Sequence, residues 1–135
     1  MTLSKILYLL LVPLLFVSTS AAGAVEWTKV GANDTTIFYV DLTSIRLEEG
    51  GVKMWNLLDL NVPDTSTYPP YLSMKSLSEY DSKAVTYRCL ESQNFSSNMG
   101  KGDVVLRIAM GEWNPAPPRS AVKTLWNIAC GHTPF

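Results

Sequence analysis

The sequence predicts one α+β domain: an antiparallel sheet of five or six strands with a C-terminal helix packed on one face. Three observations favour this fold class. Apolar and polar residues alternate through most of the chain, as in half-buried strands. Short segments rich in Gly, Pro, Asp and Asn separate these stretches, so consecutive strands are expected to be antiparallel. Only the end of the chain carries apolar residues at helical spacing.

Residues 1–24 have a composition different from the rest. Lys5 is their only charged residue, a run of apolar residues follows it, and small residues end the segment at Ala24. This order is typical of a secretory signal peptide, and we expect cleavage after Ala24. The apolar run is shorter than the roughly 20 residues of a membrane-spanning helix. The sequence therefore predicts an exported domain at residues 25–135 that does not span a membrane.

Six segments have the composition or alternation of strands. The third segment is the most regular, because Val52, Met54, Leu58, Leu60 and Val62 all occupy even positions, interrupted only by Asn56. Gly50 and Gly51 precede it and predict the turn of a hairpin with the second segment. Asp81-Ser82-Lys83 predicts a tight turn, and residues 63–70 and 92–102 are expected to be loops. The segments are Trp27–Val30, Ile37–Leu42, Val52–Val62, Tyr71–Tyr80, Ala84–Ser92 and Val104–Met110.

The C-terminal segment predicts a helix of about ten residues. Prolines between residues 115 and 118 cannot continue a ladder of strand hydrogen bonds. Ser120 is a suitable N-cap, and Gly131 is a suitable C-cap. One face collects Val122, Leu125, Trp126, Ala129 and Cys130. Such a short helix is marginal in water, so its apolar face is expected to pack on the sheet.

The two cysteines, Cys89 and Cys130, both lie in the part expected to be exported. Cys89 shares the predicted inward face of its strand with Tyr87, and Cys130 lies on the apolar face of the helix. Thiols oxidise outside the cytosol, so we expect a Cys89–Cys130 disulfide that ties the helix to the sheet. Two buried free thiols are the alternative. Neither cysteine has a C-x-x-C neighbour, which disfavours a redox or zinc site.

The sequence offers little for catalysis or nucleic-acid binding. The formal net charge is −1, so the electrostatic attraction that nucleic acids require is missing. The single histidine, His132, has no ligand or base partner in the sequence. Asp41 and Asp59 lie in neighbouring predicted strands, but an aspartate at a strand end usually binds a turn. We therefore expect a protein that is not an enzyme and that needs no cofactor or metal.

Trp55 and Leu57 are the candidate interaction surface. They occupy the odd positions of the third strand, opposite the face predicted to pack under the helix. Contiguous exposed apolar residues usually mark an interaction site. The alternative is that a loop or a partner covers this face.

Five short motifs resemble the bacterial surface-adhesin E family, in matching order and spacing over nearly all of residues 25–135. The motifs are Tyr39-Val40-Asp41-x-x-Ser44-Ile45, Met54-Trp55-x-Leu57-x-Asp59, Ser76-Leu77-x-Glu79-Tyr80-Asp81, Met99-Gly100-x-Gly102 and Leu125-Trp126-x-x-x-Cys130. The resemblance implies an antiparallel sheet of about six strands with a C-terminal helix tethered to its concave face by a disulfide. It also implies adhesion at the outer surface, through binding of host extracellular-matrix or serum proteins.

Two departures from the family pattern bear on this expectation. Ser82 stands where the family often has a cysteine, so a bridge from Cys89 would hold the helix at a different point of the sheet. The residue directly after Ala24 is Val25 and not a cysteine, so we expect no lipid anchor. A periplasmic or secreted location, as well as a cell-surface one, is compatible with this pattern. The alternative function is a soluble periplasmic envelope protein with a housekeeping or inhibitor-like binding role.

Overall fold

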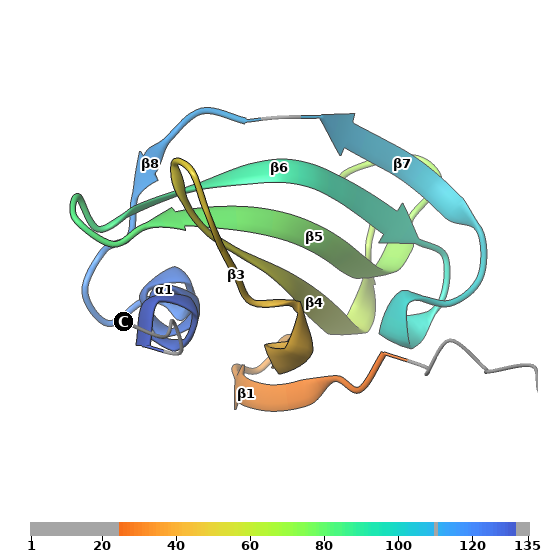
Figure 1. Ribbon diagram of the computed structural model, residues 1–135. Coiled ribbons are helices and arrows are strands. Elements are labelled where there is room, and N and C mark those ends of the chain that lie inside the picture. The colour runs from red at the N-terminus through yellow and green to blue at the C-terminus, as the bar shows by residue number, and fades with distance from the viewer. Residues whose placement is uncertain (1–24, 110, 132–135) are drawn as a thin grey trace, which may run out of the picture.

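The computed structural model describes residues 25–109 and 111–131, so the predicted signal peptide and His132 lie outside the described residues. The strands form one antiparallel sheet with the order β1-β2-β4-β5-β6-β7, which arches over α1, the one α-helix of the described residues (Figure 1). Short β3 pairs with the start of β4, and short β8 pairs with the start of β6. The strands are β1 (Thr28–Ala32), β2 (Thr36–Val40), β3 (Arg46–Glu48), β4 (Gly51–Asp64), β5 (Tyr71–Asp81), β6 (Thr86–Phe95), β7 (Val104–Ala109) and β8 (Asn114–Pro115).

The α+β fold class and its antiparallel sheet are confirmed, and each of the six predicted strand segments corresponds to a strand. The prediction of five or six strands was too low, because β3 and β8 are too short to show a period in the sequence. The hairpin prediction needs a second correction. β2 and β4 do pair, but the turn at Gly50 and Gly51 joins β3 to β4.

The register of the sheet places one row of residues on each face. Val40 pairs with Asn56 of β4, which in turn pairs with Ser76 of β5. Directly paired residues point to the same face, so the even positions of β2, β4 and β5 share the face that packs against α1. We call this the concave face. A bulge between β5 and β6 inserts Leu90, so the residues of β6 on this face change from odd (Cys89) to even (Ser92) positions.

The core lies where α1 (Ala121–Gly131) packs on the concave face. The Ser120 hydroxyl caps the helix by accepting a hydrogen bond from the Lys123 backbone N–H at 3.1 Å, as the sequence predicts. Leu125 and Ala129 are the buried residues of α1. We call the cluster that they form with the sheet the closed end of the concave face. Its residues are Val40, Val52, Met54, Tyr80, Leu125 and Ala129.

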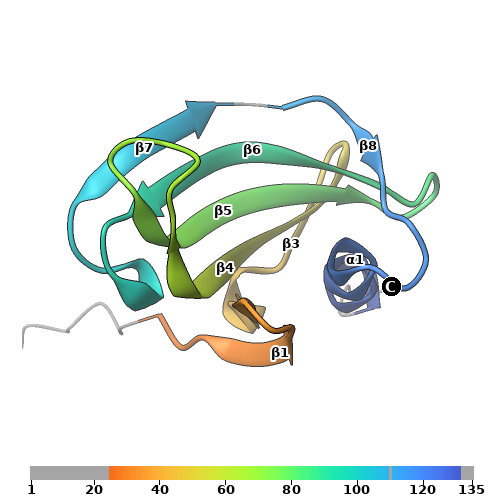
Figure 2. The ribbon, with the colours of Figure 1, turned by 180° about the vertical axis from the view of Figure 1, so that it is seen from behind.

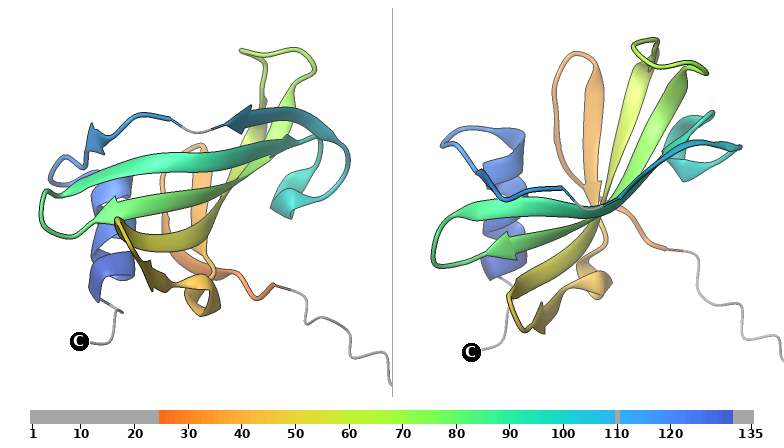
Figure 3. Two further views of the ribbon diagram at one scale, coloured as in Figure 1. Left: turned by 45° about the horizontal axis from the view of Figure 1, so that its top comes forward. Right: turned by 90° about the horizontal axis from the view of Figure 1, so that it is seen from above.

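The helix covers only part of the concave face. α1 is seen nearly end-on in Figure 1 while the long strands run across the view, so the helix crosses the strands. A helix with its side chains is about 10 Å wide, whereas the 14 residues of β4 extend over about 45 Å. The connection between β4 and β5 projects from the end remote from α1 (Figures 2 and 3). Among the described residues, no helix is long and apolar enough to cross a membrane.

Candidate functional site

Beyond the closed end, the concave face holds an open cleft of about 340 Å³. Phe38, Leu58 and Met74 contribute its floor from β2, β4 and β5, and Val122 contributes a wall from the first turn of α1. We call this region the open end. All the residues that line the cleft are uncharged: Phe38, Asn56, Leu58, Met74, Ser76, Ser78, Tyr80, Tyr87, Cys89, Ser92, Ile108, Ala121, Val122 and Leu125.

The polar side chains in the cleft floor bond to one another. The Ser76 hydroxyl donates to the Ser92 hydroxyl at 3.1 Å. The Asn56 amide donates to the Ser78 hydroxyl at 3.3 Å. Hydroxyls and amides that are paired in this way have less need of a polar ligand, because their hydrogen bonds are already made. The cleft therefore presents mainly apolar side chains to whatever enters it.

Strand β7 extends the apolar surface beyond the cleft. Ile108 lines the cleft itself, and Leu106 follows two positions away on the same face, because the two residues pair with Ser92 and Asn94 of β6. Val104 pairs with Phe95 beyond a bulge at Val105 and lies on the opposite face. Ile108 and Leu106 are 47% and 37% exposed. A row of exposed aliphatic residues next to an apolar cleft makes a contiguous patch, which in a soluble domain usually marks an interaction site.

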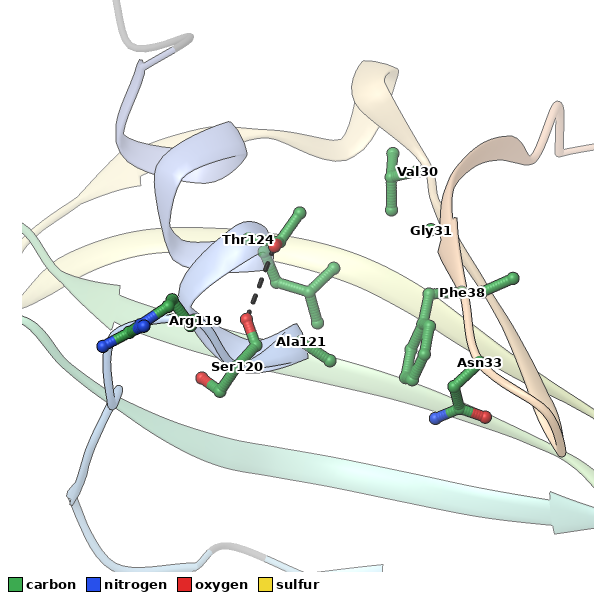
Figure 4. A pocket seen from close by; sticks show the side chains of 10 residues that line it. Val30, Gly31, Asn33, Phe38, Arg119, Ser120, Ala121 and Thr124 are labelled. Carbon is green, nitrogen blue, oxygen red and sulfur yellow. Dashed lines mark hydrogen bonds between the residues drawn. The ribbon is translucent and has the colours of Figure 1, made fainter.

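A second cavity, of about 370 Å³, adjoins the cleft and shares Phe38, Ala121 and Leu125 with it. Figure 4 shows Phe38 and Asn33 on one side of this cavity and Ser120 and Ala121 of the helix start on the other. Its wall is more polar than that of the cleft because it includes Asn33, Ser120 and Thr124. The two cavities together leave the first turn of α1 accessible on both sides.

The predicted interaction surface of Trp55 and Leu57 is only partly exposed. Leu57 is completely buried, so its assignment to an exposed surface was wrong. The connection between β6 and β7 includes the 3-10 turn Asn98–Gly100, which covers it: the Met99 N–H donates to Asp59 and the Gly100 N–H donates to Ser73. Trp55 is half-buried, with the Lys75 ammonium 4.8 Å from its ring centroid. A covering loop was the alternative that the sequence left open.

The predicted Cys89–Cys130 disulfide is not formed, and each cysteine is present as a thiol. The reason lies in the direction of α1. Val122, in the first turn, lines the cleft together with Cys89, whereas Cys130 packs against the closed end. Cys130 lies eight positions after Val122 in the helix, which corresponds to a rise of about 12 Å. A disulfide needs Cα atoms within about 7 Å of each other.

Burial affects the ionisable groups of both ends. It raises the pKa of the Cys89 thiol and of the Cys130 thiol above the ordinary value of a cysteine. It also raises the pKa of the Tyr80 phenol well above that of a free tyrosine, although hydrogen bonds with Ser78 and Asn56 act in the opposite direction. Each of these groups therefore stays neutral at physiological pH, which is consistent with an uncharged concave face.

The two aspartates considered as a carboxylate pair each bind a separate turn. Asp41 accepts hydrogen bonds from the backbone N–H and the hydroxyl of Thr43, at 3.0 and 2.6 Å, as expected for an aspartate at a strand end. Asp59 accepts from the Met99 N–H at 2.8 Å and from the Asn98 amide at 3.0 Å. Each carboxylate therefore has a structural role in holding its turn.

Sequence reasoning missed a charged cluster on the opposite face of the sheet. Glu79 is only 2% exposed, and its carboxylate accepts hydrogen bonds from Arg88 at 2.9 and 3.0 Å. The Arg88 guanidinium also lies 4.7 Å from the ring centroid of Trp113. The available signal was the tight turn at residues 81–83, because a hairpin there brings Glu79 opposite Arg88.

The comparisons with known proteins agree with this architecture. The family model described as surface-adhesin protein E matches residues 27–131, and the chain belongs to that family. No curated protein matches. Two solved structures of protein E from Haemophilus influenzae are similar to the chain. One has a TM-score of 0.55 at 13% identity and covers 77% of this chain and 96% of its own.

The second solved structure is that of protein E from non-typeable Haemophilus influenzae. It has a TM-score of 0.52 at 13% identity and covers 78% of this chain and 84% of its own. At this identity the likeness supports the fold alone. The partner of this chain must therefore be argued from its own surface.

Proposed function

We propose that this member of the surface-adhesin protein E family is an exported protein, without enzymatic activity, that binds a host extracellular-matrix or serum protein. The observation that carries the proposal is the open end of the concave face. Its cleft of about 340 Å³ is lined by uncharged residues and is continuous with the exposed residues of β7. Family membership supports the general role, and the surface chemistry supports a protein partner.

The surface favours an apolar segment of the partner. The centres of protein interfaces are depleted in charged residues, and the cleft likewise has none among its lining. The strands border the cleft on one side and the first turn of α1 borders it on another. This shape favours a side chain or loop that projects from the surface of the partner. Trp55 stays a secondary candidate, since its ring is partly accessible beneath Lys75.

Binding and location test the proposal together. Purified protein is applied to immobilised matrix and serum proteins, and its accessibility to protease is measured on intact cells. We expect saturable binding to at least one of these proteins and digestion of the protein on intact cells or its release into the medium. A protein that is protected in intact cells and binds only envelope proteins of the same cell would instead have the periplasmic binding role.

A further inference from the structure

Two cavities of different polarity meet at the first turn of α1. The cleft has an apolar lining, whereas the second cavity includes the amide of Asn33 and the hydroxyls of Ser120 and Thr124 in its wall (Figure 4). Ala121 lines both cavities, so the start of the helix stands where they join. An apolar compartment beside a polar one suits a small molecule that has a hydrocarbon part and a polar head.

The apolar compartment is narrow and crosses five strands. Its lining extends from Phe38 of β2 through Leu58, Met74 and Ser92 to Ile108 of β7. Five neighbouring strands extend over about 19 Å across a sheet. The volume of about 340 Å³ lies at the lower end of the range of small-molecule sites, about 300–1,000 Å³. So small a volume over that length favours a single alkyl chain over a bulky ring system.

The polar head would meet a positive environment. Ser120 accepts two of the first N–H groups of α1, but those of Ala121 and Val122 make no hydrogen bond with a described residue. Arg119, directly before the helix, lines the second cavity, is exposed, and forms no ion pair with a described residue. No aspartate or glutamate lines either cavity. The helix dipole and Arg119 therefore favour an anionic head.

We propose that the cleft binds one single-chain fatty acid as its carboxylate. The alkyl chain lies across the concave face toward Ile108, and the carboxylate lies at the first turn of α1 beside Arg119. The ligand is a free fatty acid, because a cleft that takes one chain does not take the two chains of a phospholipid. The proposal goes beyond host binding and does not depend on it, since it concerns a small molecule and not a protein.

Calorimetric titration of the purified protein tests the ligand class. The probes are decanoate, 1-decanol and decyltrimethylammonium, which share one chain and differ in the charge of the head. We expect one decanoate per chain and at least about tenfold weaker binding of the cationic probe. Octanoate should bind about tenfold more weakly than decanoate, because two fewer methylene groups are buried.

Variants of the two compartments test the orientation of the ligand. Met74→Glu and Ile108→Glu each place a charge in the cleft and should weaken binding of all probes at least about tenfold. Arg119→Asn removes the cation at a position with a φ of 59°, which asparagine tolerates. It should weaken decanoate about threefold and leave 1-decanol unchanged. Lys83→Asn, an exposed change outside both cavities, is the matched control.

The two cysteines report where the ligand lies. Cys89 lines the cleft, whereas Cys130 packs against the closed end. In the Cys130→Ala variant, decanoate at about ten times its dissociation constant should slow the reaction of Cys89 with N-ethylmaleimide about tenfold. In the Cys89→Ala variant, the reaction of Cys130 should be unchanged. Thermal unfolding verifies that each variant is folded.

The absence of saturable decanoate binding below its micelle concentration overturns the proposal. Equal affinity for the anionic and cationic probes, or full binding by both folded glutamate variants, also overturns it. Sedimentation with phosphatidylglycerol vesicles gives the remaining outcome: binding to vesicles without binding of decanoate would assign this face to a membrane surface. Host-protein binding by a chain that takes no decanoate, or the reverse, separates failure of this inference from failure of the proposed function.

Discussion

The closed and open ends of the concave face have similar strand residues and opposite accessibility. Met54 of β4, under α1, is completely buried, whereas Met74 of β5, in the cleft, is only half-buried. Both side chains lie on the same face of the sheet. The difference comes from α1, which crosses the strands and covers about 10 Å of their length. An apolar residue on this face is therefore core at one end and accessible surface at the other.

The largest expected effect is that of removing a side chain at the closed end. Met54→Ala leaves a cavity among Val52, Tyr80 and Leu125, and should lower the free energy of unfolding by about 4 kcal/mol. Urea unfolding measures the change. A loss below about 1 kcal/mol would mean that α1 does not seal this end.

The closed end also depends on the ion pair behind it. Arg88→Met leaves the Glu79 carboxylate buried without its cation and should cost about 3 kcal/mol of stability. The double variant Glu79→Gln/Arg88→Met removes the buried charge, so urea unfolding should show that part of the loss is recovered. Equal losses in the single and double variants would show that the charge of Glu79 is not the cause.

Alkaline pH should destabilise the closed end through Tyr80. Burial raises the pKa of this phenol in the folded state. The stabilisation that the protonated phenol provides is therefore complete below about pH 10, the pKa of an unfolded tyrosine, and is lost as pH rises above it. Above that pH, ionisation of Tyr80 should lower the free energy of unfolding by about 1.4 kcal/mol per pH unit. Urea unfolding at several pH values should show a shallower decline for Tyr80→Phe. The exposed control, Tyr68→Phe, should leave the slope unchanged.

The smallest stability effect is expected at the open end. Met74→Ala, the counterpart of Met54→Ala, should cost less than about 1 kcal/mol because water already reaches the side chain and little cavity is created. Urea unfolding of the two variants side by side tests the comparison. Equal losses would contradict the division of the concave face into two ends.

The sequence predicted the inward face of the sheet but not which part of it is accessible. Alternation places Leu58, Met74 and Ile108 on the same face as the core residues. Whether such a residue is covered depends on the direction of α1, which periodicity does not encode. The unknown direction of α1 also explains why the disulfide prediction was wrong. Cys130 lies on the helical face that packs on the sheet, but its position along the helix axis puts it against the closed end, away from Cys89.

Local irregularities limited the rest of the prediction. The bulge at Leu90 reverses the alternation within β6. The last residues of this strand, Ser92–Phe95, are mostly polar and were therefore assigned to a loop. Leu57 was assigned to the surface because of its odd position in β4, but a 3-10 turn distant in sequence, at Asn98–Gly100, covers it. Hydrogen bonds to Asp59 and Ser73 hold this turn in place. Such long-range coverage has no local signal, whereas the Ser120 cap and the Asp81 turn were predictable because their partners are local.

Binding by matched surface variants tests most directly whether the open end is the interaction surface. Met74→Glu and Val122→Glu each place a charge in the uncharged cleft, from β5 and from α1, while Trp55→Ala alters the opposite face. The affinity of each folded variant is measured for the host protein that the wild type binds. We expect both cleft variants to weaken binding at least tenfold and Trp55→Ala to leave it nearly unchanged. Full binding by both cleft variants, with loss in Trp55→Ala, would contradict the assignment.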